Sequence, residues 1–132
     1  MKIDLRTLML SDIGLAALCD DRIYWMVRPQ DDPFPSVVLH LISNIPNYTY
    51  QGESALKFSR VQCDLYAESD MDGEALAIAF KKAVSGFRGI TGATDFKGIF
   101  IDGWRESVDA GKTESELLFR TSIDLTINHK EV

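Results

Sequence analysis

The chain has 132 residues, 45% hydrophobic and 26% charged, and it carries a formal net charge of −6. This composition is typical of one globular domain and disfavours an intrinsically disordered chain. It also disfavours a protein that grips a nucleic-acid backbone, because such binding needs clustered Lys and Arg. No apolar run approaches the roughly 20 residues of a membrane-spanning helix, so we expect no membrane partner.

The first 18 residues predict helices. Apolar side chains recur at helical spacing over residues 2–10 and 12–18, and Ser11 or Asp12 caps the second stretch. The N-terminus lacks the apolar core and the cleavage site of a signal peptide. We therefore expect the protein to stay in the cytoplasm of the cell that makes it.

Strand patterns follow the helices. Residues 23–27 predict a short strand, and the prolines between positions 28 and 35 predict an extended loop. Residues 36–43 are apolar on both faces, which is typical of a central strand that is covered on both sides. Residues 44–55 then predict a long loop or a protruding hairpin.

Two later segments repeat the pattern Arg-x-x-(Cys/Ile)-Asp-Leu, beginning at Arg60 and at Arg120. Apolar and polar residues alternate in both, which predicts half-buried strands with one face on the core. If the strands are neighbours, Arg60, Asp64, Arg120 and Asp124 can form a cross-strand charge ladder. The alternative is that these polar residues only solvate one face of a sheet.

The remaining segments complete the predicted order. Residues 71–87 predict a helix, residues 96–104 a strand, residues 106–115 a polar turn region and residues 116–129 the last strand. We therefore predict an α+β fold in a single domain spanning residues 1–132. Its sheet is mainly antiparallel, has about four strands and carries helices packed on one face.

No catalytic or metal-binding set emerges from the sequence. His40 and His129 are the only histidines, and neither has the spacing of a zinc motif. Cys63 and Asp64 are adjacent on a predicted strand, so they face opposite sides and cannot act together with His40. Cys19 and Cys63 are predicted to be buried thiols in a reducing compartment. We predict that the protein is not an enzyme and has no cofactor.

Five short patterns follow one another along almost the whole chain. They are Leu8-x-x-x-Asp12-x-Gly14-x-x-Ala17-Leu18, Arg22-Ile-Tyr24, the pair Pro29 and Pro35, Arg60-Val-Gln-x-Asp64-x-Tyr66-Ala67, and Leu118-x-Arg120-x-Ser122-x-Asp124-Leu125. In this order they resemble the tail-completion, or tail-terminator, family of long-tailed bacteriophages, prophages and gene transfer agents. These proteins end the tail or join it to the head.

The resemblance implies a virion protein that assembles into a ring, usually of six copies. The ring stacks on the tail-tube protein and docks to the head connector or stopper protein, and DNA passes through it without specific binding. From the net charge of −6 we hypothesise that the acidic subunit, repeated around the ring, makes the channel negative, so that DNA slides through it. The family has no catalytic or cofactor-binding residues to transfer.

In such a ring, exposed aromatic and polar residues are candidates for assembly contacts. They are Tyr48, Tyr50, Gln51, Trp104, Arg60, Asp64, Arg120 and Asp124. Two other functions stay open. One is a neck or stopper protein on the connector side, and the other is a small non-enzymatic domain whose Arg60, Gln62, Tyr66 and Arg120 bind an anionic metabolite.

Overall fold

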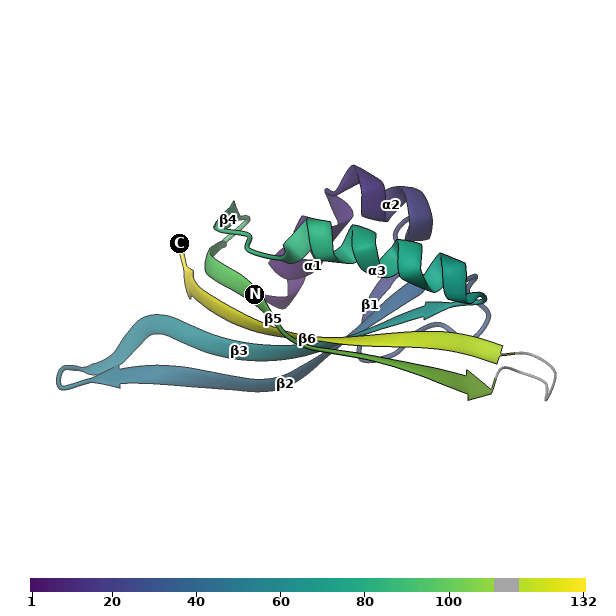
Figure 1. Cartoon of the computed structure of the whole chain (residues 1–132). Coiled ribbons are helices and arrows are strands. Elements are labelled where there is room, and N and C mark those ends of the chain that lie inside the picture. The colour runs from purple at the N-terminus through teal and green to yellow at the C-terminus, as the bar shows by residue number, and fades with distance from the viewer. Residues whose placement is uncertain (111–116) are drawn as a thin grey trace.

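A long, curled β-sheet with three helices in its hollow makes up the protein (Figure 1). The computed structural model describes residues 1–110 and 117–132. The elements, in chain order, are α1 (Lys2–Leu10), α2 (Ile13–Cys19), β1 (Ile23–Trp25), β2 (Ser36–Thr49), β3 (Gly52–Ala67), α3 (Asp70–Val84), β4 (Gly89–Thr91), β5 (Thr94–Ala110) and β6 (Leu117–Glu131).

The sheet is mixed and has six strands in the order β1-β2-β3-β6-β5-β4. The pair β1 and β2 is parallel, and the other neighbouring pairs are antiparallel. Strands account for 54% of the structure and helices for 25%, and the sheet curls into a half-barrel. The predicted four-stranded, mainly antiparallel sheet with helices on one face is therefore wrong, because the strands are longer and more numerous and the sheet bends around the helices.

The sheet has an inner side, toward the helices, and an outer side. On β3 and β6 the inner side carries Val61, Leu65, Ile123 and Leu125, all at most 1% exposed. The helices supply further buried side chains, including Phe80 of α3, which is fully buried. These positions are the apolar half of the alternating pattern, so the repeated Arg-x-x-(Cys/Ile)-Asp-Leu segments form neighbouring strands that share one core.

The starts of α2 and α3 follow from capping side chains. The Asp12 carboxylate accepts a hydrogen bond from the backbone N–H of Leu15 at 2.9 Å, and the Ser69 hydroxyl accepts one from Asp72 at 3.1 Å. The predicted helix over residues 71–87 ends earlier, at Val84. The backbone N–H of Gly86 instead donates to the carbonyl of Ile99, which directs the chain into β4.

Several predicted boundaries differ from the structure. The polar turn predicted over residues 106–115 is wrong up to residue 110, because β5 continues to Ala110, and residues 111–115 lie outside the described residues. The sequence did not predict β4, which has only three residues. β1 ends at Trp25 because Met26 adopts a left-handed backbone conformation with a φ of 70°.

Residues 44–55 form the far part of the hairpin made by β2 and β3. Strand pairing continues to Thr49 and Gly52, with Tyr50 and Gln51 between them as the turn. β6 pairs with β3 only as far as Lys57, so the hairpin extends past its neighbour. It projects from the body of the molecule (Figure 1).

Candidate functional site

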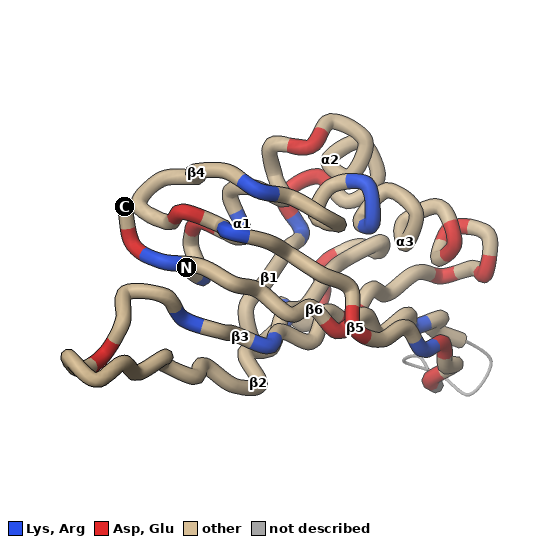
Figure 2. The backbone as a smooth tube through the Cα atoms, turned by 60° about the vertical axis from the view of Figure 1, so that its left-hand side comes forward, with Lys and Arg blue, Asp and Glu red and all other residues tan. Residues whose placement is uncertain are grey.

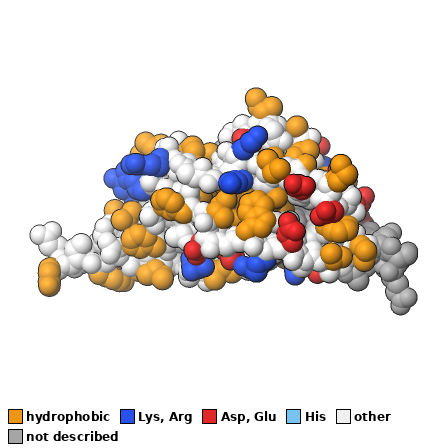
Figure 3. All heavy atoms as spheres, viewed as in Figure 1, with side chains coloured by type: hydrophobic (Ala, Val, Ile, Leu, Met, Phe, Trp, Pro, Cys, Tyr) orange, Lys and Arg blue, Asp and Glu red, His pale blue; other side chains and the backbone are white. Residues whose placement is uncertain are grey.

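The tip of the β2/β3 hairpin is the most exposed aromatic feature of the described residues. Tyr48 is 68% exposed and Tyr50 is fully exposed, and Gln51 beside them is also exposed. The Thr49 hydroxyl orders the turn, because it accepts a hydrogen bond from the backbone N–H of Gln51 at 3.3 Å. Figure 3 shows apolar side chains at this projecting tip. Two tyrosines held on an ordered turn are suited to anchor a partner.

The outer side of the sheet carries ion pairs that cross from β3 and β6 to β5. Arg60 lies 2.9 Å from Asp102, Arg105 lies 2.6 Å from Asp124, and Arg120 lies 3.5 Å from Asp109. Figure 2 shows positive and negative residues interleaved along these strands. Each of these three arginines thus has a carboxylate partner, so β3, β5 and β6 add little unpaired positive charge to this side.

The register explains why the pairing differs from the predicted ladder. Arg60 lies opposite Thr126, and Asp64 lies opposite Ser122, so no arginine faces an aspartate directly across the two repeated segments. The third strand, β5, supplies the missing partners. Gly103 makes one of these pairs possible, since a Cβ at this position would lie 2.8 Å from the Asp124 carboxylate.

Asp64 differs from the other predicted interface residues because it is buried. Its residue exposure is 5%, and it accepts hydrogen bonds from the Ser122 hydroxyl at 2.8 Å and from the Gln62 amide at 3.1 Å. His40 Nε2 lies 3.4 Å from the same carboxylate. A satisfied, buried carboxylate holds β2, β3 and β6 together but cannot itself touch a partner.

Trp104 lies on the other side of the sheet from the ion pairs. It is directly opposite Ile123, whose side chain points into the core, so the indole is on the inner side of β5. Trp104 is nevertheless 41% exposed. The structure therefore separates the predicted interface residues into three places, which are the hairpin tip, the outer side and the β5 edge.

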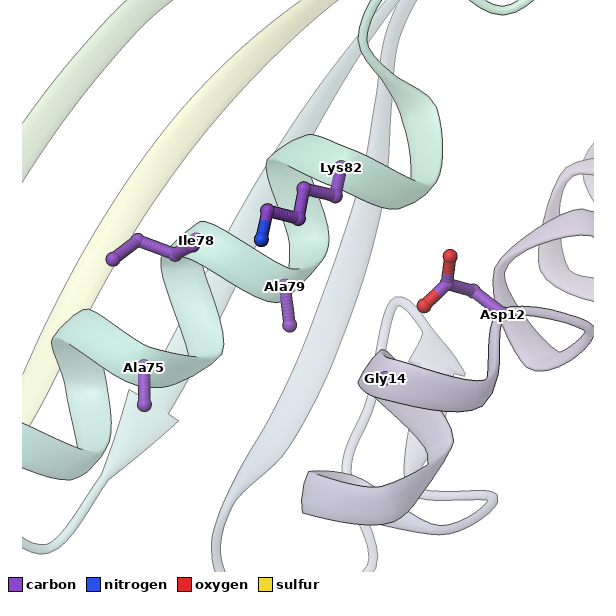
Figure 4. A pocket seen from close by; sticks show the side chains of 6 residues that line it. All are labelled: Asp12, Gly14, Ala75, Ile78, Ala79 and Lys82. Carbon is purple, nitrogen blue, oxygen red and sulfur yellow. The ribbon is translucent and has the colours of Figure 1, made fainter.

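The sequence analysis did not predict the surface depressions, of which two are formed by segments far apart in the sequence. One lies between α2 and α3 (Figure 4) and is lined by Asp12, Gly14, Ala75, Ile78, Ala79 and Lys82. The other lies on the outer side, where the segment that follows β1 places Arg28 over the Phe34 ring at 4.0 Å. The proline-rich sequence gave no signal for this second site, because its walls come from the loop and from β2, β3 and β6.

The described residues do not form a nucleophile or metal site. Among them, no three His, Cys, Asp or Glu side chains come together as metal ligands. Cys63 and Asp64 face opposite sides of β3, as predicted, and His40 lies on the outer side with Asp64. Burial raises the pKa of Cys19 to about 11 and that of Cys63 well above its usual value, so both thiols stay protonated. Burial also lowers the pKa of His129, which lies 2.8 Å from the Ser59 hydroxyl.

None of the helices in the described part of the chain is long and apolar enough to cross a membrane.

Comparison with known proteins identifies the fold. No protein-family model and no curated protein sequence matches the chain significantly. Among solved structures, the chain is similar to one in a structure described as "Virion of native gene transfer agent (GTA) particle". The TM-score is 0.75 at 15% sequence identity, over 98% of this chain and 94% of the other. A similarity at this identity shows that the two chains share a fold.

Proposed function

We propose that the protein is a structural, non-enzymatic subunit of a phage-like particle, which forms a ring at the head-proximal end of the tail tube. It ends the tail and joins it to the head connector or stopper protein. The single observation that carries this proposal is the fold shared with a gene transfer agent virion chain, because the similarity spans nearly the full length of both chains. The order of sequence patterns described above supports the same role. A neck or stopper role on the connector side is the alternative.

The exposed hairpin tip supports an assembly role. Tyr48 and Tyr50 expose large side chains that the subunit itself does not cover. Burying an aromatic side chain in an interface is strongly favourable, and such residues are enriched where proteins meet. In the proposed ring, the tip contacts the neighbouring subunit or the tail-tube protein.

The outer-side ion pairs suit a channel through which DNA passes without being held. Binding to phosphate depends on unpaired Lys and Arg. Arg60 and Arg120 each lie beside an aspartate, and the chain as a whole is acidic. The same pairing disfavours the metabolite-binding alternative, since an anion would have to displace these carboxylates.

The role is tested by deleting the gene from the cluster that encodes the particle and imaging the products by electron microscopy. The proposal predicts filled heads beside unattached or overlong tails. Mass spectrometry of wild-type particles should detect the chain. Joined, normal particles from the deletion strain would contradict the proposal.

The hairpin tip is tested by the double substitution Tyr48→Ser and Tyr50→Ser. Both side chains are exposed, so the subunit should stay folded, but joined particles should decrease by about tenfold or more, the effect of losing about 1.4 kcal/mol of contact free energy. The control is Ile3→Ser combined with Ile13→Ser, because these helix residues are also highly exposed, at 81% and 87%. Equal yields from both double variants would show that the tip makes no assembly contact.

A further inference from the structure

Two long strands of the sheet have backbone that no other strand covers. β1 pairs with β2 only over Val37–Leu39, and β4 pairs with β5 only over Thr94–Phe96. The backbone N–H of Gly86 donates to the carbonyl of Ile99, and the N–H of Ile99 donates to the carbonyl of Phe87. The backbone of β5 is therefore paired as far as Ile99. Among the described residues, β2 from His40 and β5 from Phe100 therefore have no strand on their free side.

The free edge of β2 lacks the charges by which monomeric proteins protect such strands, whereas β5 carries Asp102, Arg105, Glu106 and Asp109 along its free part. Protected edges are short, charged or covered. β2 has 14 residues and contains no Lys, Arg, Asp or Glu. Ile42 and Ile45 on β2 are both 58% exposed, and Phe100 on β5 is 52% exposed. Pro46 has no N–H to donate to a further strand, so the stretch of β2 available for pairing is His40–Ile45.

The directions of the two edges match one another. Three antiparallel steps separate β2 from β5 in the sheet, so the two strands run in opposite directions. A second copy in the same orientation therefore places its β2 antiparallel to β5 of the first, with the inner and outer sides continuous across the junction. This contact satisfies both edges of every copy, whereas β2 against β2 would leave β5 open.

We propose that His40–Ile45 of one copy pairs with Phe100–Arg105 of a second copy, and that this contact repeats around the ring. The inference rests on the proposed function, because a ring needs a contact between two different surfaces of the subunit. The partner is a second copy of this chain, since each copy carries both complementary edges.

The short strands β1 and β4 set the register of this pairing. The paired residues can be followed from β2 across β3 and β6 to β5. They place Leu39 of β2 in line with Trp104 of β5, and Ile45 in line with Gly98. Without a shift, β4 of one copy would meet the second copy's β2 beyond Ser43. A slide of about two residues, roughly 7 Å, moves this meeting point to beyond Ile45, where Pro46 ends the pairing, and places Ile45 beside Phe100. Strands in closed sheets are tilted and staggered in this way.

Ile45 and Phe100 are both on the outer side of the sheet. Ile45 lies opposite Phe58, which is two residues from Arg60 on β3 and therefore on the same side. Phe100 lies opposite Thr126, which in turn lies opposite Arg60. The double variant Ile45→Cys with Phe100→Cys should therefore form a ladder of covalent oligomers under mild oxidation. The native Cys19 and Cys63 are buried and should not contribute. The control, Ile13→Cys with Phe100→Cys, should stay monomeric, and so should each single variant.

Both purified protein and assembled particles should be tested. A ladder from the Ile45 and Phe100 pair in either sample, with monomers from the controls, supports the pairing. A dimer from Ile45→Cys alone would show β2 against β2 and overturn it, as would the absence of a ladder in both samples. If the purified protein forms the ladder but particles lack the chain, edge pairing holds and the proposed function fails. If particles contain the chain and neither sample forms a ladder, only edge pairing fails.

A second substitution tests the same contact without cysteines. Ile45→Lys adds a charge to the free edge of β2 at an exposed position, so the subunit should fold normally. We expect ring formation or incorporation into particles to fall by about tenfold or more, which equals a loss of about 1.4 kcal/mol. Ile13→Lys, on the exposed surface of α2, should leave assembly unchanged. Equal assembly of the two variants would overturn the inference.

Discussion

Along Val61–Leu65 of β3 and Ile123–Ile127 of β6, the inner side is apolar and buried beneath the helices, whereas the outer side of the same two strands is held together by polar contacts. Ile123 and Leu65 on the inner side are at most 1% exposed. Arg60 on the outer side lies in solvent with its partner Asp102, and their side chains are 52% and 47% exposed. The alternating sequence thus supplies both sides of the sheet, but only the interactions on the outer side are screened by water.

This difference separates the residues that hold the fold from those that are free to take part in assembly. Apolar burial contributes roughly 25 cal/mol per Å² of surface removed from water, and exposed ion pairs contribute about 0 to 1 kcal/mol. Asp64 is intermediate, because it belongs to the polar pattern and yet is buried. Three experiments of decreasing expected effect test this ranking.

The largest effect is expected for Ile123→Ala on the inner side. Ile123 is fully buried, so the substitution leaves a cavity and should lower the free energy of unfolding by about 2 to 5 kcal/mol. Ile45→Ala, at a 58% exposed position on the outer side, is the matched control and should change it by about 0.5 kcal/mol or less. Denaturant unfolding of the dilute monomer measures both. Equal losses would remove the distinction between the two sides.

An intermediate effect is expected for Asp64→Ala. The substitution leaves the Ser122 hydroxyl and the Gln62 amide without their acceptor in a buried position, which should cost about 1 to 3 kcal/mol. Asp102→Ala removes a carboxylate of similar geometry from an exposed site and should cost less than about 1 kcal/mol. If the two variants unfold at the same denaturant concentration, burial does not distinguish Asp64 from its neighbours.

The alternating pattern predicted the repeated segments well, because one side of each strand packs on the core. The pattern fails where a strand has two exposed sides. Residues 106–110 look like a turn because Glu106, Ser107 and Asp109 are polar, yet they lie on an edge strand, where polar residues are tolerated on both sides. Pro46 and Gly52 likewise indicate a loop, although both belong to strands. Pro46 lies at the free edge of β2, and Gly52 follows the two-residue turn.

Sequence analysis placed the candidate interface residues on strands but not their partners. The spacing of Arg60 and Asp64 fixes their side of the sheet, whereas the partners of the arginines depend on β5 and on the register between strands. The burial of Asp64 and the position of Trp104 on the inner side are also tertiary properties. The exposed tyrosines were easier to identify, because a turn sequence surrounds them.

The smallest effect is expected for the pair of Arg60 and Asp102, and a double-mutant cycle measures it. Arg60→Ala, Asp102→Ala and the double variant together isolate the coupling energy of the two side chains. Both are half exposed, so the coupling should be below about 1 kcal/mol. It should also decrease in high salt, because the Debye length falls from about 10 Å at 0.1 M to about 3 Å at 1 M. A coupling above 2 kcal/mol that resists salt would show that this part of the outer side is shielded from water, and the two sides of the sheet would then differ less than their exposure indicates.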